Sequence, residues 1–211
     1  MKNVILSLTA LLIAGVGFAQ TIGQQPISFG IKAGPNFSSY TSKASGTKTT
    51  SKLIVGLEAG VYANISLADE FYFQPSLLYA GKGGKDKNSD TKINLSYLEL
   101  PLDFLFKPDI GNGNKFIVGV GPYVAYGIGG SVKGSAPSYD PFKAGGPNNN
   151  GALKRFDAGA NVQLGYEIPK GFNVGLNTDL GLINLQNGGD NNNSFRNTSF
   201  AVTVGYTFKG R

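Results

Sequence analysis

The side chains of this chain best suited to chemistry are charged residues that share one face of the predicted strands. Six carboxylates and three bases fall on one face of the predicted strands, and paired acids can serve acid–base catalysis or line a path for cations. A narrow barrel offers no substrate-sized cleft, so we predict instead that they form an ion-pair network filling a barrel interior. The predicted interior network comprises Lys32, Glu58, Glu99, Asp103, Lys115, Arg155, Asp157, Glu167 and Asp179.

Histidine and cysteine are both absent from the 211 residues. Membrane-barrel hydrolases of the familiar kinds use a histidine to activate a serine or a water, so the sequence excludes those mechanisms. A serine–lysine pair remains open at Ser42-Lys43 or Ser51-Lys52, although both are common loop composition. We therefore expect no enzyme, no catalytic residue, no metal site and no cofactor.

Eight stretches alternate apolar and polar residues and must position these charges. Between Phe116 and Tyr126, Val118, Val120 and Val124 fall on one face, whereas the glycines fall on the other. Period two indicates β-strands, because successive side chains leave a strand on opposite sides. The sequence predicts an all-β fold, an eight-stranded antiparallel transmembrane up-and-down β-barrel. Its expected strands are 28–37, 52–66, 70–81, 93–107, 115–129, 154–168, 171–185 and 197–208.

The connections between these strands alternate in length. Those at 38–51, 82–92, 130–153 and 186–196 are long and polar, and the other three are short. Outer-membrane barrels carry long loops outside and tight turns on the periplasmic side, which predicts a periplasmic amino terminus. The longest loop, 130–153, is rich in Pro and Asn, and we expect it to be mobile and without assigned structure.

Alternation alone does not say which face points outward, and a soluble lipocalin-like carrier would turn the apolar face inward. Ten tilted residues match the apolar band of a membrane barrel, and aromatic residues gather at the strand ends as in interfacial girdles. Both observations favour lipid outside. The expected girdles are Phe71, Phe73, Phe104, Phe106, Phe116, Phe172, Tyr206 and Phe208 on the periplasmic side, with Phe37, Tyr79, Tyr97 and Tyr126 on the outer side.

Residues 1–19 have the pattern of a secretory signal peptide. A positive start at Lys2 precedes the apolar run 4–16, and small residues follow at Gly17 and Ala19. The run is too short for a helix that spans a bilayer, which needs about 20 residues. We expect a signal peptide over 1–19 and a single outer-membrane barrel domain over 20–211.

The formal net charge of +6 has an uneven distribution. Acids concentrate in the predicted strands and bases in the loops, whereas a nucleic-acid binder needs a basic stripe on one folded face, so we expect no nucleic-acid partner. The loop bases either engage lipopolysaccharide phosphates or an acidic partner, or only keep the loops solvated. The basic outer loops are marked by Lys43, Lys48, Lys52, Lys82, Lys85, Lys87 and Lys92.

Six segments along the chain have motifs typical of small membrane barrels: Gly30–Phe37, Phe73–Tyr79, Tyr97–Leu102, Gly119–Tyr123, Phe156–Gly159 and Gly181–Asn184. In this order they resemble the PorT-like outer-membrane β-barrel family of Bacteroidota-type bacteria. The resemblance implies an eight-stranded barrel in the outer membrane, and the family's namesake takes part in protein export linked to gliding. The chain departs from the pattern in continuing past Phe208 with Lys209-Gly210-Arg211, and in carrying the charged Asp103 at an interior position.

We therefore expect a monomeric, non-enzymatic protein in the outer membrane of a Gram-negative bacterium. Its expected role is that of a structural or partner-binding envelope component, in export or surface attachment. The expected partners are outer-membrane lipid, including lipopolysaccharide, and another envelope protein. A small channel and a soluble periplasmic lipocalin-like ligand carrier are the alternatives, and an eight-stranded lumen is too narrow for an open aqueous path.

Overall fold

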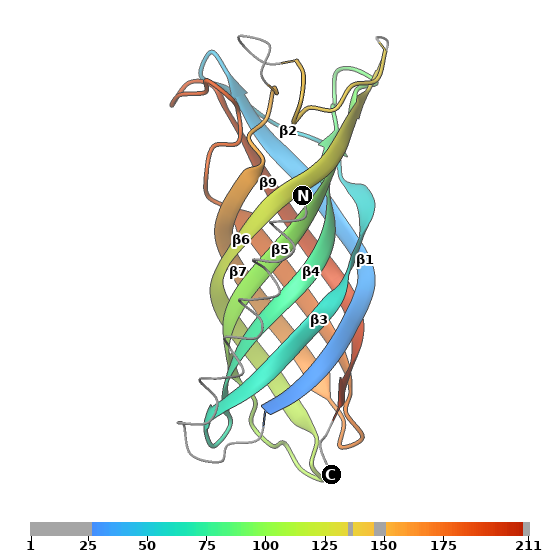
Figure 1. The fold of residues 1–211 in the computed structure, drawn as a ribbon, viewed down its shortest axis with the longest axis vertical. Helices are drawn as coiled ribbons and strands as arrows, with labels where there is room; N and C mark the ends of the chain where they lie inside the picture. Colours follow the sequence, from blue (N-terminus) through green and yellow to red (C-terminus); the bar gives the residue numbers. More distant parts are fainter. Residues whose placement is uncertain (1–26, 135–136, 146–150, 209–211) are drawn as a thin grey trace, which may run out of the picture.

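The chain folds into a closed barrel of antiparallel strands (Figure 1). The structure is a computed structural model that describes residues 27–134, 137–145 and 151–208. The predicted signal peptide 1–19 lies outside the described residues. The strands are β1 (Ile27–Ala44), β2 (Thr47–Thr50), β3 (Ile54–Ala68), β4 (Phe71–Lys85), β5 (Lys92–Phe106), β6 (Lys115–Lys133), β7 (Phe156–Glu167), β8 (Phe172–Gly181) and β9 (Ser194–Phe208).

Eight of these strands make the barrel wall. Neighbours along the chain pair from β3 to β9, β1 pairs with β3, and β1 also pairs with β9, which closes the sheet. The short β2 pairs only with the end of β1, from Thr41↔Thr50 to Ala44↔Thr47, and so continues the wall past the point where the pairing of β1 with β3 ends. The predicted eight-stranded antiparallel barrel is confirmed.

The two ends of the barrel differ (Figure 1). Long connections β1–β3, β4–β5, β6–β7 and β8–β9 gather at one end, here called the loop end, and the short connections gather at the other, here called the turn end. β1 starts at the turn end. The predicted alternation of long and short connections is therefore present in the fold.

The apolar face of each strand points outward. Val55, Val120 and Val204 are 65%, 58% and 65% exposed, whereas the alternate residues of the same strands point into the barrel. A lipocalin-like carrier needs the opposite arrangement and is not favoured. No helix long and apolar enough to cross a membrane occurs within 27–134, 137–145 and 151–208.

Aromatic rings on the outer surface gather near the turn end. Phe71 packs on Phe106 with ring centroids 5.1 Å apart, and Phe172 packs on Tyr206 at 4.9 Å. The expectation for Tyr97 is wrong, because this ring is fully buried inside the barrel, where its centroid lies 5.8 Å from that of Phe142. The ladder between β5 and β6 shifts register at Ser96/Tyr97, close to this ring.

The strands extend further toward the loop end than the alternation predicts. β1 continues to Ala44, β4 to Lys85 and β6 to Lys133, whereas β8 ends early at Gly181. Polar and glycine residues in these extensions continue the backbone ladder, as in the pairs Lys82↔Leu95 and Ser131↔Asn94. Side-chain alternation does not reveal such extensions, because polar and glycine residues occupy both faces of the strand there.

Candidate functional site

A buried lysine and two carboxylates form the central layer of the barrel interior, here called the Lys82 layer. Lys82 Nζ lies 2.6 Å from Glu99 Oε2 and 3.0 Å from Asp179 Oδ2, and these side chains are almost completely buried. The same ammonium lies 4.5 Å from the ring centroid of Tyr123. β4, β5, β6 and β8 supply these residues, so the layer ties opposite parts of the wall together.

The placement of Lys82 in an outer loop is wrong. β4 continues for four residues past Gly81, and Lys82 takes the inward position that follows Leu78 and Ala80 on this strand. The sequence around it, Gly81-Lys82-Gly83-Gly84, has loop composition, but Gly83 and Gly84 are both buried in the ladder with β5. A β-carbon on either glycine would collide with Ile93 or Ser51, which is why the strand carries glycine there.

Hydrogen bonds extend the central layer toward the turn end. Asn161 Nδ2 and Ser199 Oγ donate to the two oxygens of Asp179, at 2.7 and 3.0 Å. Asn177 Nδ2 donates to Glu58 Oε1 at 3.2 Å, and Asn177 Oδ1 accepts from Lys32 Nζ at 3.4 Å. Asn177 therefore connects an acid of β3 to a base of β1 across the interior.

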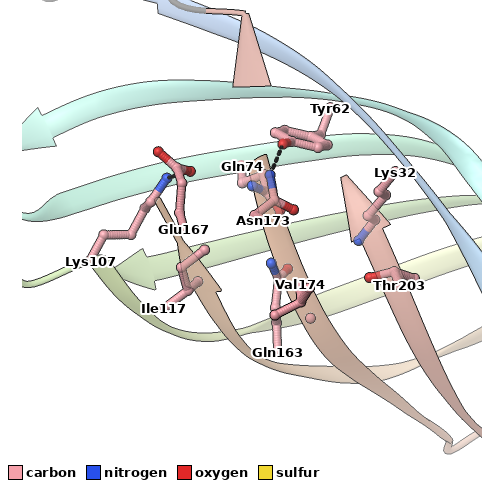
Figure 2. A pocket seen from close by; sticks show the side chains of 11 residues that line it. Lys32, Tyr62, Gln74, Lys107, Ile117, Gln163, Glu167, Asn173, Val174 and Thr203 are labelled. Atoms are coloured by element: carbon pink, nitrogen blue, oxygen red, sulfur yellow. Dashed lines mark hydrogen bonds and ion pairs between the residues drawn. The ribbon is translucent and has the colours of Figure 1, made fainter. Parts of the chain in front are cut away.

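A second ion pair lies near the turn end, beside a small cavity (Figure 2). Lys107 Nζ lies 2.8 Å from Glu167 Oε2, and Asn173 Nδ2 donates to the hydroxyl of Tyr62 at 2.9 Å. The cavity measures about 10 Å³, room for about one water molecule. Its wall also includes Lys32, Gln74, Gln163 and Thr203.

The nine residues of the predicted interior network divide into three groups. Lys115 has the inward parity of β6 and lies half-buried near the turn end, where its Nζ contacts the Tyr72 hydroxyl at 3.2 Å, whereas Arg155 lies apart at the loop end. Asp157 lies inside the barrel, where it accepts from Asn197 at 3.3 Å. The other six are buried in the layers described above or beside them: Lys32, Glu58, Glu99, Asp103, Glu167 and Asp179.

Arg155 is not part of an interior ion-pair network, contrary to the expectation. It precedes β7, donates to the carbonyl oxygen of Gly127 at 2.6 Å and places its guanidinium over the rings of Tyr126 and Phe142. The expected strand 154–168 starts two residues before β7, which is why parity placed Arg155 near the interior acids.

A hydrophobic lid closes the loop end of the barrel. Phe142, from the long β6–β7 connection, is 6% exposed and lies over Gly127, where a β-carbon would collide with its ring. The connection is held by the bridges Val132↔Tyr139 and Leu153↔Gln186. The lid cluster consists of Tyr40, Leu95, Tyr97, Tyr123, Ala125, Phe142, Leu153, Leu185 and Phe195.

The expectation that 130–153 carries no structure is wrong for the parts of this segment that the structure describes. Its described parts, 130–134, 137–145 and 151–153, contain buried residues and backbone hydrogen bonds, such as Leu153 N–H to Pro141 at 2.9 Å. The sequence did not reveal that Phe142 fixes this segment by packing into the barrel, because one large apolar side chain in a polar segment produces no periodic signal.

The remaining lysines of the predicted basic loops lie at the loop end. Lys43 is the second-last residue of β1, Lys48 is in β2, Lys52 pairs with Lys85 in an isolated bridge, and Lys92 starts β5. Lys48, Lys52, Lys87 and Lys92 are exposed. Lys85 Nζ contacts the exposed Asp90 at 3.0 Å.

Besides Lys82, sequence reasoning missed the inward Lys107 and the role of Tyr123. Lys107 directly follows β5 and has the same parity as Glu99 and Asp103, which is the signal that could have found it. Tyr123 has inward parity and is fully buried beside Lys82, but alternation does not indicate which charge a ring contacts. In the part of the chain that the structure describes, no three acidic residues are arranged as a metal site.

Comparison with known proteins gives the family. The family model for the outer membrane protein beta-barrel domain matches residues 18–187. No curated protein matches the chain. Solved structures that resemble it include OprG from Pseudomonas aeruginosa, with 14% identity, coverage of 89% of this chain and 99% of that one, and a TM-score of 0.49.

Two further structures show similar agreement. Outer Membrane Protein W of E. coli has 17% identity, coverage of 88% of this chain and 100% of that one, and a TM-score of 0.47. The attachment invasion locus protein Ail of Yersinia pestis has 11% identity, coverage of 86% and 98%, and a TM-score of 0.44. On the family match, which spans most of its length, the chain belongs to the outer membrane protein beta-barrel domain family.

Proposed function

We propose that this protein is a non-enzymatic, non-conducting barrel that acts through its surface at the loop end. The observation that carries the proposal is the filled interior: the lid cluster covers the loop end, and the Lys82 layer lies beneath it. The interior of an eight-stranded barrel is just wide enough for side chains. This argues against the small-channel alternative and leaves the outer surface to bind partners.

The loop end has an excess of positive charge. Its described bases outnumber its acids, Asp86, Asp90, Asp140 and Asp190. The bases are Lys43, Lys48, Lys52, Lys85, Lys87, Lys92, Lys133, Lys143, Lys154, Arg155 and Arg196. We infer that this surface binds the phosphate groups of lipopolysaccharide, since clustered lysines beside a membrane attract anionic head groups by about 1 kcal/mol each.

The remaining expectations about the cell envelope belong to the same proposal. We propose that residues 1–19 are a signal peptide and that the turn end and the amino terminus face the periplasm. We also propose that the barrel is a monomer. The resemblance to PorT-like barrels supports another envelope protein as the alternative partner, in an export or attachment assembly.

The test measures binding of fluorescent lipopolysaccharide to the purified protein in detergent micelles. We expect the triple variant Lys52→Gln, Lys87→Gln, Lys92→Gln to bind more weakly, and the wild-type affinity to fall as salt screens the attraction. Lys115→Gln, near the turn end, is the matched control and should bind as wild type does. Equal affinity of the triple variant and wild type would overturn the lipopolysaccharide assignment.

Two further measurements separate the alternatives. Single-channel recording should show no steady conductance, and a reproducible open level would revive the channel. Cross-linking in the native envelope that joins the loop end to one protein in fixed ratio would favour the assembly component over the lipid-binding barrel.

A further inference from the structure

The buried charges inside the barrel do not balance. Among the described residues, the buried ionisable groups include three lysines, Lys32, Lys82 and Lys107. They face twice as many carboxylates, namely Glu58, Glu99, Asp103, Asp157, Glu167 and Asp179. Buried charges need compensation, so the interior requires additional positive charge or bound protons.

The buried interior also lacks hydrogen-bond donors. Several buried oxygens have no hydrogen-bond partner among the described residues, and most of them are amide or carboxylate oxygens that can only accept. They include Asn36 Oδ1, Gln74 Oε1, Asn161 Oδ1, Gln163 Oε1 and both oxygens of Asp103. An interior with surplus acceptors is satisfied by donors or cations and not by further protein oxygens.

Asp103 lacks both a compensating positive charge and a hydrogen-bond donor. Its side chain is fully buried, and neither carboxylate oxygen has a hydrogen-bond partner. The charges that act on it are those of Lys32, Asp179 and Glu58. Asp179 is already paired with Lys82 at 3.0 Å, which leaves two carboxylates, Asp103 and Glu58, to share one lysine.

A second oxygen lies beside Asp103. Gln74 is its register partner across β4 and β5, and both side chains point inward. Gln74 Nε2 donates to Asn64 Oδ1 at 2.8 Å, so its Oε1 is the atom left without a partner. Gln74 also lines the cavity near the turn end (Figure 2).

We propose that the barrel interior binds a small monovalent cation, of the size of sodium, at Asp103 and Gln74 with Glu58 near by. Carboxylate and amide oxygens are the ligands that hard cations prefer. A single positive charge matches the local excess of one carboxylate.

The cation reaches the site from the turn end. The lid cluster covers the loop end with apolar side chains, whereas the cavity at the turn end is lined mostly by polar side chains, Gln74 among them. Its size of about 10 Å³ admits a water or a bare small ion and excludes organic cations such as choline. The proposal does not depend on binding at the loop end.

The test compares unfolding by urea in sodium chloride and in choline chloride at equal ionic strength, with the protein in micelles. A ligand that binds only the folded state lowers the unfolding equilibrium constant, by about tenfold when sodium is at about ten times its dissociation constant. We expect this effect in wild type and its loss in Asp103→Asn. Asp69→Asn, in an exposed turn, is the matched control and should keep it.

Two outcomes would overturn the site. Wild type with the same urea midpoint in both salts would mean that protons or water, and not sodium, compensate Asp103. An Asp103→Asn variant that keeps the sodium effect would place the ion elsewhere. If Asp103→Asn does not fold, Gln74→Leu is the second variant, and line broadening of the ²³Na resonance by the folded protein, reduced in this variant, gives a direct readout. Unchanged broadening in Gln74→Leu would count against the site.

Discussion

Lys82 and Glu99 form the shortest ion pair inside the barrel, with Nζ 2.6 Å from Oε2 and both side chains at most 1% exposed. Lys82 also reaches Asp179 on β8, so a single ammonium connects β4, β5 and β8. The aromatic ring of Tyr123 covers the same ammonium from β6. This lysine therefore holds together two carboxylates that would otherwise repel each other in a buried interior.

Lys82→Met is expected to destabilise the barrel by about 3–5 kcal/mol, because removal of one partner leaves buried carboxylates without compensation. The double variant Lys82→Met, Glu99→Gln should lose less than the sum of the two single variants, since they share one interaction. Urea unfolding in lipid vesicles measures each free energy. Strict additivity would show that the pair does not couple.

A matched lysine–acid pair at the surface provides the control. Lys85 and Asp90 are 3.0 Å apart, but their side chains are 43% and 91% exposed. Lys85→Met should change the free energy of unfolding by about 1 kcal/mol or less. A cost for Lys85→Met equal to that for Lys82→Met would mean that burial does not set the contribution of these pairs.

Val120→Arg tests which face contacts lipid. Val120 is 58% exposed on the outer surface of β6, so an arginine there faces the bilayer and should cost about 2–4 kcal/mol if it lies near the midplane. Val120→Leu should be close to neutral. Unfolding of Val120→Arg in lipid at the wild-type urea midpoint would contradict the face assignment.

The neighbouring Gly121 tests the opposite face. It points inward, and a β-carbon would collide with the carbonyl oxygen of Leu102 and come within 2.8 Å of Asp103 Cα. Because backbone atoms must move, Gly121→Ala should destabilise by about 1–3 kcal/mol in detergent as well as in lipid. A penalty seen only in lipid would instead place residue 121 on the outer surface.

Phe142→Ala should release the lid without opening a pore. The substitution removes the ring that packs on Tyr97 and lies over Gly127, and we expect faster trypsin cleavage after the exposed Lys143. Conductance should stay absent, because the Lys82 layer still fills the interior. Ser138→Ala, an exposed residue of the same connection, should be cleaved like wild type. Equal cleavage rates for Phe142→Ala and wild type would contradict the anchoring role of this ring.

The wall of the barrel was predictable from sequence because strand geometry is local. Period-two alternation correctly placed Val120 outward and Gly121 inward, and parity in β5 correctly turned Glu99 and Asp103 inward. The pairing of consecutive strands follows from short turns and from closure. These features require only the near neighbours of each residue.

The contacts across the interior were not predictable in the same way. Whether Lys82 meets Asp179 depends on the register of every strand between them, and a shift of one pair changes the height at which two side chains face each other. Lys82 also lies among glycines, which suggested a loop, and Phe142 lies in a segment without periodicity. Both residues are fixed by tertiary packing.

Asp190 gives a pH-dependent prediction at the loop end. Its Oδ1 accepts hydrogen bonds from the backbone N–H groups of Asn192 and Asn193, at 2.9 and 2.7 Å, and these bonds hold the pKa of this exposed carboxyl below its ordinary value of 3.8. A depressed pKa in the folded state means that the ionised form favours the folded turn. The contribution is therefore complete well above pH 3.8 and is lost as the pH falls through the lower, folded-state pKa.

We expect the amide resonances of Asn192 and Asn193 to move together below pH 3.8, with a midpoint under that value. An NMR titration in micelles measures this directly. In Asp190→Ala the two amides should already resemble the acid form at neutral pH and should show no such titration. The control is Asp86→Ala, which removes the equivalent acceptor for Asn88 and Ser89 in the β4–β5 loop. It should leave the titration of the Asn192 and Asn193 amides unchanged. A midpoint at or above the ordinary value would mean that the two N–H groups do not stabilise the carboxylate, and that other contacts, such as that of the Asn184 amide with the carbonyl of Asn193 at 3.0 Å, hold this turn.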